Sequence, residues 1–154
     1  MRTSVPKTAY IAHGELIPMI LLELQLVNRP EEIARIIDAL ERFGKAHGVP
    51  RNVIHDMNVS LDEVLSNIIS HACAGDAVRM IAVRLTLTDR QLVANIDDEG
   101  KPFDPLTVAP PNLNGPSKDR AIGGLGIHFV RALMDHVVYV RRDDRNCLEL
   151  KKEL

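Results

Sequence analysis

Leu61-Asp62-Glu63-Val64-Leu65-Ser66-Asn67-Ile68-Ile69-Ser70-His71 is the most informative segment of the chain, because it carries two patterns at once. Its apolar residues recur at i, i+3, i+4 and i+7, which is the spacing of one helix face: Leu61, Val64, Leu65 and Ile68. Glu63, Asn67 and His71 are spaced by four, so they form a polar stripe beside that face. The segment predicts a helix over 51–74. A carboxylate and an amide on its polar edge could serve as a general base and as a metal or phosphate ligand, and a solvated helix edge without a chemical role is the alternative.

The segments on either side of this helix predict an α+β two-layer sandwich. Before it come an alternating strand over 20–27 and a helix that starts at Pro30 and ends near Gly48. After it the pattern predicts two hairpins separated by a helix that ends near 134, with strands over 78–88, 91–97, 136–142 and 147–152, the last two joined by a turn at 143–146. Helices packed on one face of a mixed, mostly antiparallel sheet satisfy this order. Residues 1–17 show no clear period and are expected to form a loose arm before a single domain over 18–154.

A second cluster is the Asp-x-Gly sequence formed by Asp98 and Gly100, directly after the predicted strand 91–97. A carboxylate at a strand end can point into a cleft, and a glycine allows the backbone to approach a ligand closely. A polar turn that merely ends the strand is the structural alternative, because Asp and Gly dominate turns in any case.

A third cluster is Gly123-Gly124-Leu125-Gly126, which precedes a helix and follows a proline-rich stretch over 100–122. Glycines before a helix leave backbone N–H groups free to bind an anion such as phosphate, while hinge glycines without a ligand are the alternative. The segment lacks the Lys-Ser/Thr of a P-loop. A loop of this length inside one domain is typical of a lid or a binding loop.

Composition narrows the functional classes. The chain has 154 residues, 45% hydrophobic residues and a formal net charge of −2, so a disordered chain, a membrane-embedded protein and a dedicated nucleic-acid binder are not expected. Only 3% of the residues are aromatic and none is Trp, which disfavours a site built on stacked rings. No signal peptide is recognisable, and Cys73 and Cys147 are expected to be reduced thiols in the cytoplasm.

Taken together, the three clusters resemble the GHKL ATPase superfamily, and within it the stand-alone bacterial anti-sigma factor serine-protein kinases. Two phrases carry the closer resemblance: Asp-Glu-Gly-Lys-Pro-Phe-Asp-Pro at 98–105, and Gly-Gly-Leu-Gly-Ile-His-Phe-Val-Arg-Ala-Leu-Met-Asp at 123–135. The resemblance extends over about residues 18–154 and implies the histidine-kinase-like ATPase fold. The absence of sensor, phosphoacceptor and transducer segments argues against a histidine kinase or a topoisomerase subunit.

The resemblance implies a role for each matched position on the helix and the strand end. Asn67 corresponds to the ligand of the Mg²⁺ that bridges the phosphates of ATP, and Glu63 to the general base that accepts the proton of the substrate hydroxyl. Asp98 corresponds to the residue that accepts a hydrogen bond from the adenine amino group, and Gly100 admits the base beside it. His71 matches a polar position of the nucleotide site whose role varies.

For the loop and the glycine cluster, the resemblance implies an ATP lid over about 104–122. Gly123, Gly124 and Gly126 correspond to the phosphate-facing hinge at its end. Lys118 and Arg120 lie within this range of the sequence and are candidates for contact with the phosphates.

The implied function is an ATP- and Mg²⁺-dependent serine/threonine-protein kinase that acts as an anti-sigma regulatory factor. Its expected substrate is a STAS-domain anti-anti-sigma protein, and a sigma factor is the alternate partner in the resulting partner-switching circuit. Members of this group commonly form homodimers, and no direct contact with nucleic acid or membrane is expected. The alternative is a catalytically weak ATP-binding module that sequesters a regulatory protein.

Overall fold

The computed structural model describes residues 7–12, 15–72, 77–107 and 125–154. Within them the chain forms a six-stranded sheet and three α-helices. In chain order the elements are β1 (Lys7–Ala12), β2 (Glu15–Val27), α1 (Glu31–His47), α2 (Arg51–Asn67), a π-helical turn η1 (Ile68–Ala72), β3 (Met80–Leu87), β4 (Gln91–Asp98), a short 3₁₀ turn η2 (Pro105–Thr107), α3 (Leu125–Leu133), β5 (His136–Arg142) and β6 (Arg145–Glu153).

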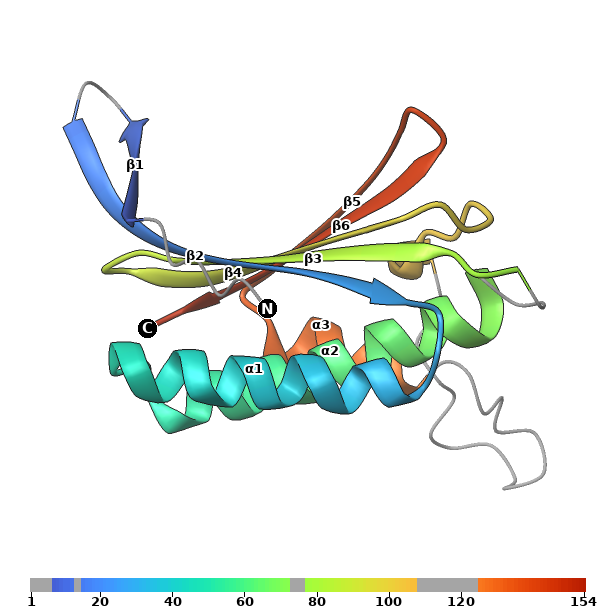
Figure 1. The fold of residues 1–154 in the computed structure, drawn as a ribbon, viewed down its shortest axis with the longest axis horizontal. Coiled ribbons are helices and arrows are strands. Elements are labelled where there is room, and N and C mark those ends of the chain that lie inside the picture. The colour runs from blue at the N-terminus through green and yellow to red at the C-terminus, as the bar shows by residue number, and fades with distance from the viewer. Residues whose placement is uncertain (1–6, 13–14, 73–76, 108–124) are drawn as a thin grey trace.

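The strands follow the order β1-β2-β3-β4-β6-β5, and every pair of neighbours among them is antiparallel. The helices form a second layer on one face of this sheet (Figure 1). The predicted α+β two-layer sandwich is therefore confirmed. No helix in the described ranges combines the length and the apolar character needed to cross a bilayer.

The core lies between the two layers. Alternate residues of each central strand point toward the helices, as the pleat of a strand requires, and on β4 these are Leu92, Ala94, Ile96 and Asp98. The predicted apolar face of α2 meets them, and Leu61, Val64 and Leu65 are all buried. Helices α1 and α2 approach closely because residue 44 is a glycine: a β-carbon there would lie 2.6 Å from Cγ1 of Ile54.

The loose arm predicted for residues 1–17 is wrong for the part that the structure describes. Residues 7–12 form β1, which pairs with the first part of β2, with Ala9 opposite Pro18. This hairpin is not recognisable from the sequence, because Pro18 interrupts the strand pattern. Pro18 is tolerated since pairing of β2 with β3 begins only at Ile20, so its missing N–H costs no bond on that side.

Two other boundaries differ from the sequence prediction. The second helix was expected to continue to residue 74, but α2 ends at Asn67 and the chain widens into the π-turn η1, while residues 73 and 74 lie outside the described ranges. The final hairpin turns more tightly than expected. Its turn consists of Asp143 and Asp144, both with positive φ, so β6 already begins at Arg145.

Candidate functional site

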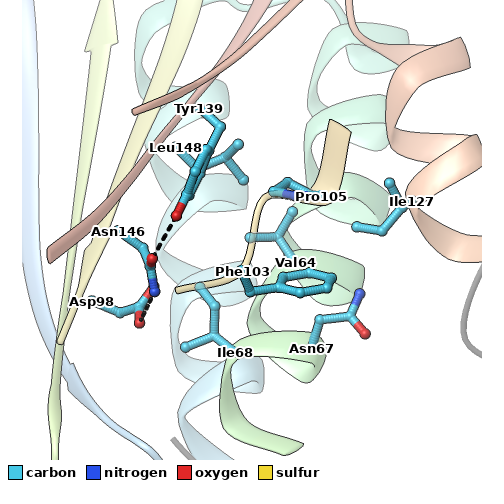
Figure 2. Close-up of a pocket in the computed structure, with 10 residues that line it drawn as sticks. All are labelled: Val64, Asn67, Ile68, Asp98, Phe103, Pro105, Ile127, Tyr139, Asn146 and Leu148. Carbon is cyan, nitrogen blue, oxygen red and sulfur yellow. Dashed lines mark hydrogen bonds between the residues drawn. The ribbon is translucent and has the colours of Figure 1, made fainter. Parts of the chain in front are cut away.

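A pocket opens between the two layers at one end of the sheet, with a volume of about 350 Å³ when the solvent-open space at its mouth is counted. Figure 2 shows residues from α2, η1, β4, β5, β6, α3 and the segment after β4 converging on it. Its walls are mainly apolar, with a few polar groups among them. The lining residues are Val64, Asn67, Ile68, Asp98, Phe103, Pro105, Ile127, Tyr139, Asn146 and Leu148.

Asp98 is the buried carboxylate of this pocket. It is the last residue of β4 and continues the inward register of that strand, which leaves it only 2% exposed. Its Oδ1 accepts hydrogen bonds from the Gly100 amide at 2.7 Å and from Asn146 Nδ2 at 2.9 Å. Its Oδ2 accepts none from the described part of the chain. In a residue that is almost fully buried, a carboxylate oxygen to which the described part of the chain donates no hydrogen bond can accept one from a ligand.

Gly100 fixes the segment that follows Asp98. Its N–H donates to Asp98, and its carbonyl accepts a hydrogen bond from Arg141 Nη1 at 3.0 Å. The N–H and the carbonyl of Gly100 thus hold the Asp98 carboxylate and the chain in place. The polar-turn alternative accounts for the first bond, but not for the burial of Asp98 in a pocket wall.

Glu63 and Asn67 form one hydrogen-bonded unit on α2. Asn67 Nδ2 donates to Glu63 Oε1 at 2.7 Å, as the spacing of four allows. The amide oxygen of Asn67 accepts no hydrogen bond from the described residues, and Asn67 lines the pocket. Since Mg²⁺ prefers oxygen ligands and keeps several waters, a single amide oxygen beside phosphate groups fits this ion.

Gly126 lies in the first turn of α3 and faces Glu63. A β-carbon at this position would overlap the carboxylate carbon and both carboxylate oxygens of Glu63. The glycine therefore lets α3 approach α2 at the polar stripe. Its neighbours Gly123 and Gly124, as well as Lys118 and Arg120, lie outside the described residues.

Of the remaining predicted features, the lid and His71, only part of the lid lines this pocket. Of the predicted lid over 104–122, residues 104–107 are described, and Pro105 lines the pocket. Phe103, just before this segment, also lines it and lies beside Asn67 in Figure 2. His71 lies on η1 with an exposed side chain and is not among the lining residues, so the structure does not join it to the pocket.

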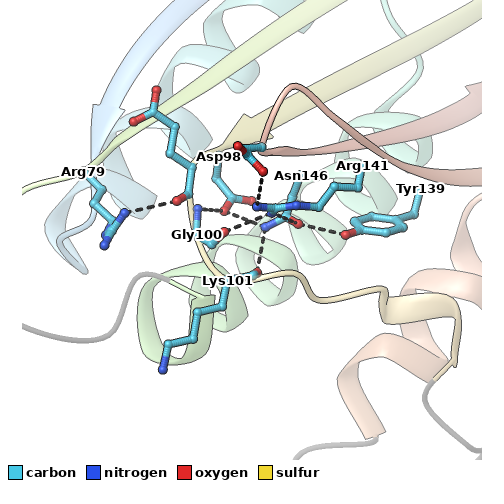
Figure 3. A network of polar contacts seen from close by, with 9 residues as sticks. Arg79, Asp98, Gly100, Lys101, Tyr139, Arg141 and Asn146 are labelled. Carbon is cyan, nitrogen blue, oxygen red and sulfur yellow. Dashed lines mark hydrogen bonds and ion pairs between the residues drawn. The ribbon is translucent and has the colours of Figure 1, made fainter.

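Three polar residues of the β5–β6 hairpin were missed by the sequence analysis. Tyr139 and Asn146 line the pocket. Arg141 donates hydrogen bonds to Asn146 and to the Gly100 carbonyl (Figure 3). Asn146 was assigned to the turn, but it is an inward-facing residue of β6 and is 4% exposed. A signal was present: Asn146 shares its period-two register with Leu148 and Leu150, so a polar residue stands where the pattern requires an apolar one.

Comparison with known proteins agrees with this geometry. The model of the histidine kinase-like ATPase domain matches residues 26–152, which is most of the chain. The chain belongs to the histidine kinase-like ATPase domain family. The residues of the pocket described above all fall within the matched range, and so do the three sequence clusters.

Several proteins that the chain resembles are protein kinases by name. The serine-protein kinase RsbW of Listeria monocytogenes serovar 1/2a is 27% identical over 120 residues, covering 75% of this chain and 76% of the relative. The serine/threonine-protein kinase BtrW of Bordetella bronchiseptica is 34% identical over 94 residues, covering 61% of this chain and 66% of the relative. The predicted resemblance to the GHKL-type anti-sigma factor kinases is confirmed.

A solved structure shares the fold. The crystal structure of the RsbU and RsbW domains of Rv1364c from Mycobacterium tuberculosis superposes with a TM-score of 0.62 at 16% identity. The match covers 85% of this chain and 31% of that one. It supports the histidine-kinase-like ATPase architecture of the sheet and its helical layer.

Proposed function

We propose that this protein is an ATP-dependent serine/threonine-protein kinase that acts as an anti-sigma regulatory factor. The observation that carries the proposal is the convergence of Asp98 and Asn67 on one pocket, with Glu63 hydrogen-bonded to Asn67. In this proposal Asp98 binds the nucleobase, Asn67 holds Mg²⁺ and Glu63 accepts the proton of the substrate. Relatives that carry kinase names support the same assignment.

The pocket suits the adenine end of ATP. Oδ2 of Asp98 is the acceptor for the adenine amino group, and the apolar walls contributed by Val64, Ile68 and Leu148 cover the faces of the base. Gly100 allows the base to lie next to the backbone. Gly126 lies in the first turn of α3, where backbone N–H groups and the helix dipole favour negative charge. We propose that it contacts the phosphates together with Gly123 and Gly124, which precede the helix in the sequence. We assign His71 no contact with the base.

The catalytic step asks the chain mainly for positioning. When bound, Mg²⁺-ATP supplies the phosphoryl group and the charge neutralisation that its transfer needs. Asn67 would provide an amide oxygen to the metal, and its side-chain NH₂ group donates a hydrogen bond to Glu63 Oε1, which helps to position the carboxylate. The Glu63 carboxylate would accept the proton of the substrate hydroxyl as that oxygen forms its bond to the γ-phosphorus. The bond between this phosphorus and the bridging oxygen would break, and ADP would leave with that oxygen.

The substrate that we propose is a serine or threonine on a STAS-domain anti-anti-sigma protein. In the corresponding circuit the kinase alternates between this protein and a sigma factor, acts in the cytoplasm and forms a homodimer. These finer assignments rest on the similarity to RsbW and BtrW.

The test uses the purified full chain, the STAS protein encoded nearest to it, Mg²⁺ and γ-labelled ATP. Wild type is expected to transfer label to the STAS protein. Glu63→Gln is expected to abolish transfer and to keep ATP binding, because the glutamine oxygen can still accept the bond from Asn67. Transfer by Glu63→Gln at the wild-type rate would contradict the role of Glu63.

The second candidate is an ATP-binding module that sequesters its partner without phosphorylating it. One observation favours it: Glu63 is hydrogen-bonded to Asn67 and packed against Gly126, so its carboxylate is already engaged on two sides. Under this candidate wild type binds both ATP and the STAS protein, and no label is transferred. The same experiment therefore separates the two functions.

A further inference from the structure

We propose that Arg141 and Asn146 are positioning residues that orient Asp98 and thereby select a purine with an exocyclic amino group. The inference rests on the proposed function in one respect, since it takes the ligand of the pocket to be a purine nucleotide. It assigns a function to the β5–β6 hairpin, which none of the three sequence clusters includes.

Asn146 is a fully bonded buried amide. Its Nδ2 donates to Asp98 Oδ1 at 2.9 Å and to the Lys101 carbonyl at 3.0 Å. Its Oδ1 accepts from the Tyr139 hydroxyl at 2.8 Å and from Arg141 Nη1 at 2.9 Å. An amide group can make four such bonds, two as donor and two as acceptor, so this side chain has no capacity left.

Arg141 determines which way this amide faces. A guanidinium group only donates hydrogen bonds, so the atom of Asn146 that faces it must be the oxygen. The NH₂ group must then point at Asp98 and Lys101. The reversed amide would place a donor against Arg141 and an acceptor against the Asp98 carboxylate. Arg141 is itself held by the Gly100 carbonyl, which ties it to the Asp-x-Gly turn (Figure 3).

The consequence for Asp98 is that its two oxygens become different. Oδ1 is saturated by the Gly100 amide and by Asn146, and Oδ2 remains as the acceptor available to a ligand. An amino group on the base matches that acceptor. A carbonyl oxygen at the same position would face a second acceptor in a buried setting, where an unpaired polar group costs most. Selectivity therefore depends on Asn146, although Asp98 makes the contact.

The experiment compares two probes that differ only in the amino group, ATP and purine riboside 5′-triphosphate, by isothermal titration calorimetry with Mg²⁺. Wild type is expected to bind ATP at least about tenfold more tightly than the analogue. Asn146→Ala is expected to weaken ATP binding about tenfold and to leave binding of the analogue unchanged. A purely structural role would weaken both probes by the same factor, and that outcome would overturn the inference.

A second variant keeps the test decisive where Asn146→Ala fails to fold. Arg141→Gln removes the obligate donor that orients the amide, so the ratio of the two affinities is expected to fall. Arg142→Gln, at the adjacent exposed position of β5, is the matched control and is expected to keep the wild-type ratio. An unchanged ratio in Arg141→Gln would refute the role of Arg141. Failure of wild type to bind either nucleotide would refute the proposed function itself, which is a distinguishable result.

Discussion

The Glu63 carboxylate on α2 lies directly against the backbone of Gly126 on α3, in the space that any larger residue at 126 would need for its β-carbon. The contact joins two segments that the sequence analysis had treated as separate clusters. It makes the position of the proposed general base dependent on the packing of a second helix.

Replacing Gly126 with alanine is expected to displace Glu63 and to lower phosphoryl-transfer turnover roughly a hundredfold, the scale of a misplaced general base. Turnover on the STAS substrate and ATP affinity are measured together, and turnover is expected to fall by the larger factor. His128→Ala is the control, because His128 is an exposed residue of the same helix. If Gly126→Ala turned over at the wild-type rate, the observed position of Glu63 would not be needed for phosphoryl transfer.

Asp98→Asn is expected to raise the Kd for ATP roughly tenfold to a hundredfold. The asparagine oxygen can still accept from Gly100 and Asn146, but its NH₂ group would then meet the amino group of adenine, donor against donor. Calorimetric titration with ATP measures the effect. Asp97→Asn is the neighbouring control, since Asp97 lies on the opposite face of the sheet and pairs with Cys147; equal losses in the two variants would count against the assignment.

Lys152 is expected to contribute to stability, because it joins α2 and α3 to β6. Its Nζ donates to the Leu133 carbonyl at 2.7 Å and lies 3.2 Å from Asp56 Oδ2, with both charged side chains less than one fifth exposed. Lys152→Met should lower the free energy of unfolding by about 2 kcal/mol, measured by urea denaturation. Arg84→Ala removes an exposed ion pair with Glu23 and should change the free energy of unfolding by less than about 0.5 kcal/mol.

The thiol of Cys147 is expected to react slowly at neutral pH. Burial raises its pKa, and so do the hydrogen bond to Asp97 and the charge of that carboxylate, so at a given pH less of the reactive thiolate is present. In a Cys73→Ser background, the rate of reaction with a thiol reagent should rise at a higher pH than it does for a free cysteine derivative. Asp97→Asn should lower the pKa and speed the reaction; an unchanged pH profile would contradict this cause.

Much of the fold follows from local patterns. Helical and alternating periodicity predicted α1, β3, β4 and β5 close to their observed bounds, and it predicted the start of α2 but not its end. The contact between Glu63 and Asn67 also follows from spacing alone, since residues four apart share a helix face.

The features that sequence analysis missed depend on pairing between distant strands. Residues 7–12 carry no strong alternation, since an edge strand such as β1 can be held mainly by backbone bonds to its neighbour. Asn146 acquires its role only because β6 pairs with β4, and the acidic residues at 143 and 144 made the turn look longer than it is. A contact between residues of two different hairpins cannot be predicted from local sequence patterns, because it depends on how the strands pair.

The sheet order also has a consequence for how the pocket is assembled during synthesis. Asp98 and Asn146 are neighbours on paired strands but stand 48 positions apart in the chain, so their contact closes a long loop, as the pairing of β2 with β3 also does. A ribosome-bound chain that lacks β6 has every residue of the three sequence clusters, yet it lacks the wall that orients Asp98. Under the proposed function, nucleotide capture is expected to begin only after the last strand has joined the sheet, so bound nucleotide would report completed folding.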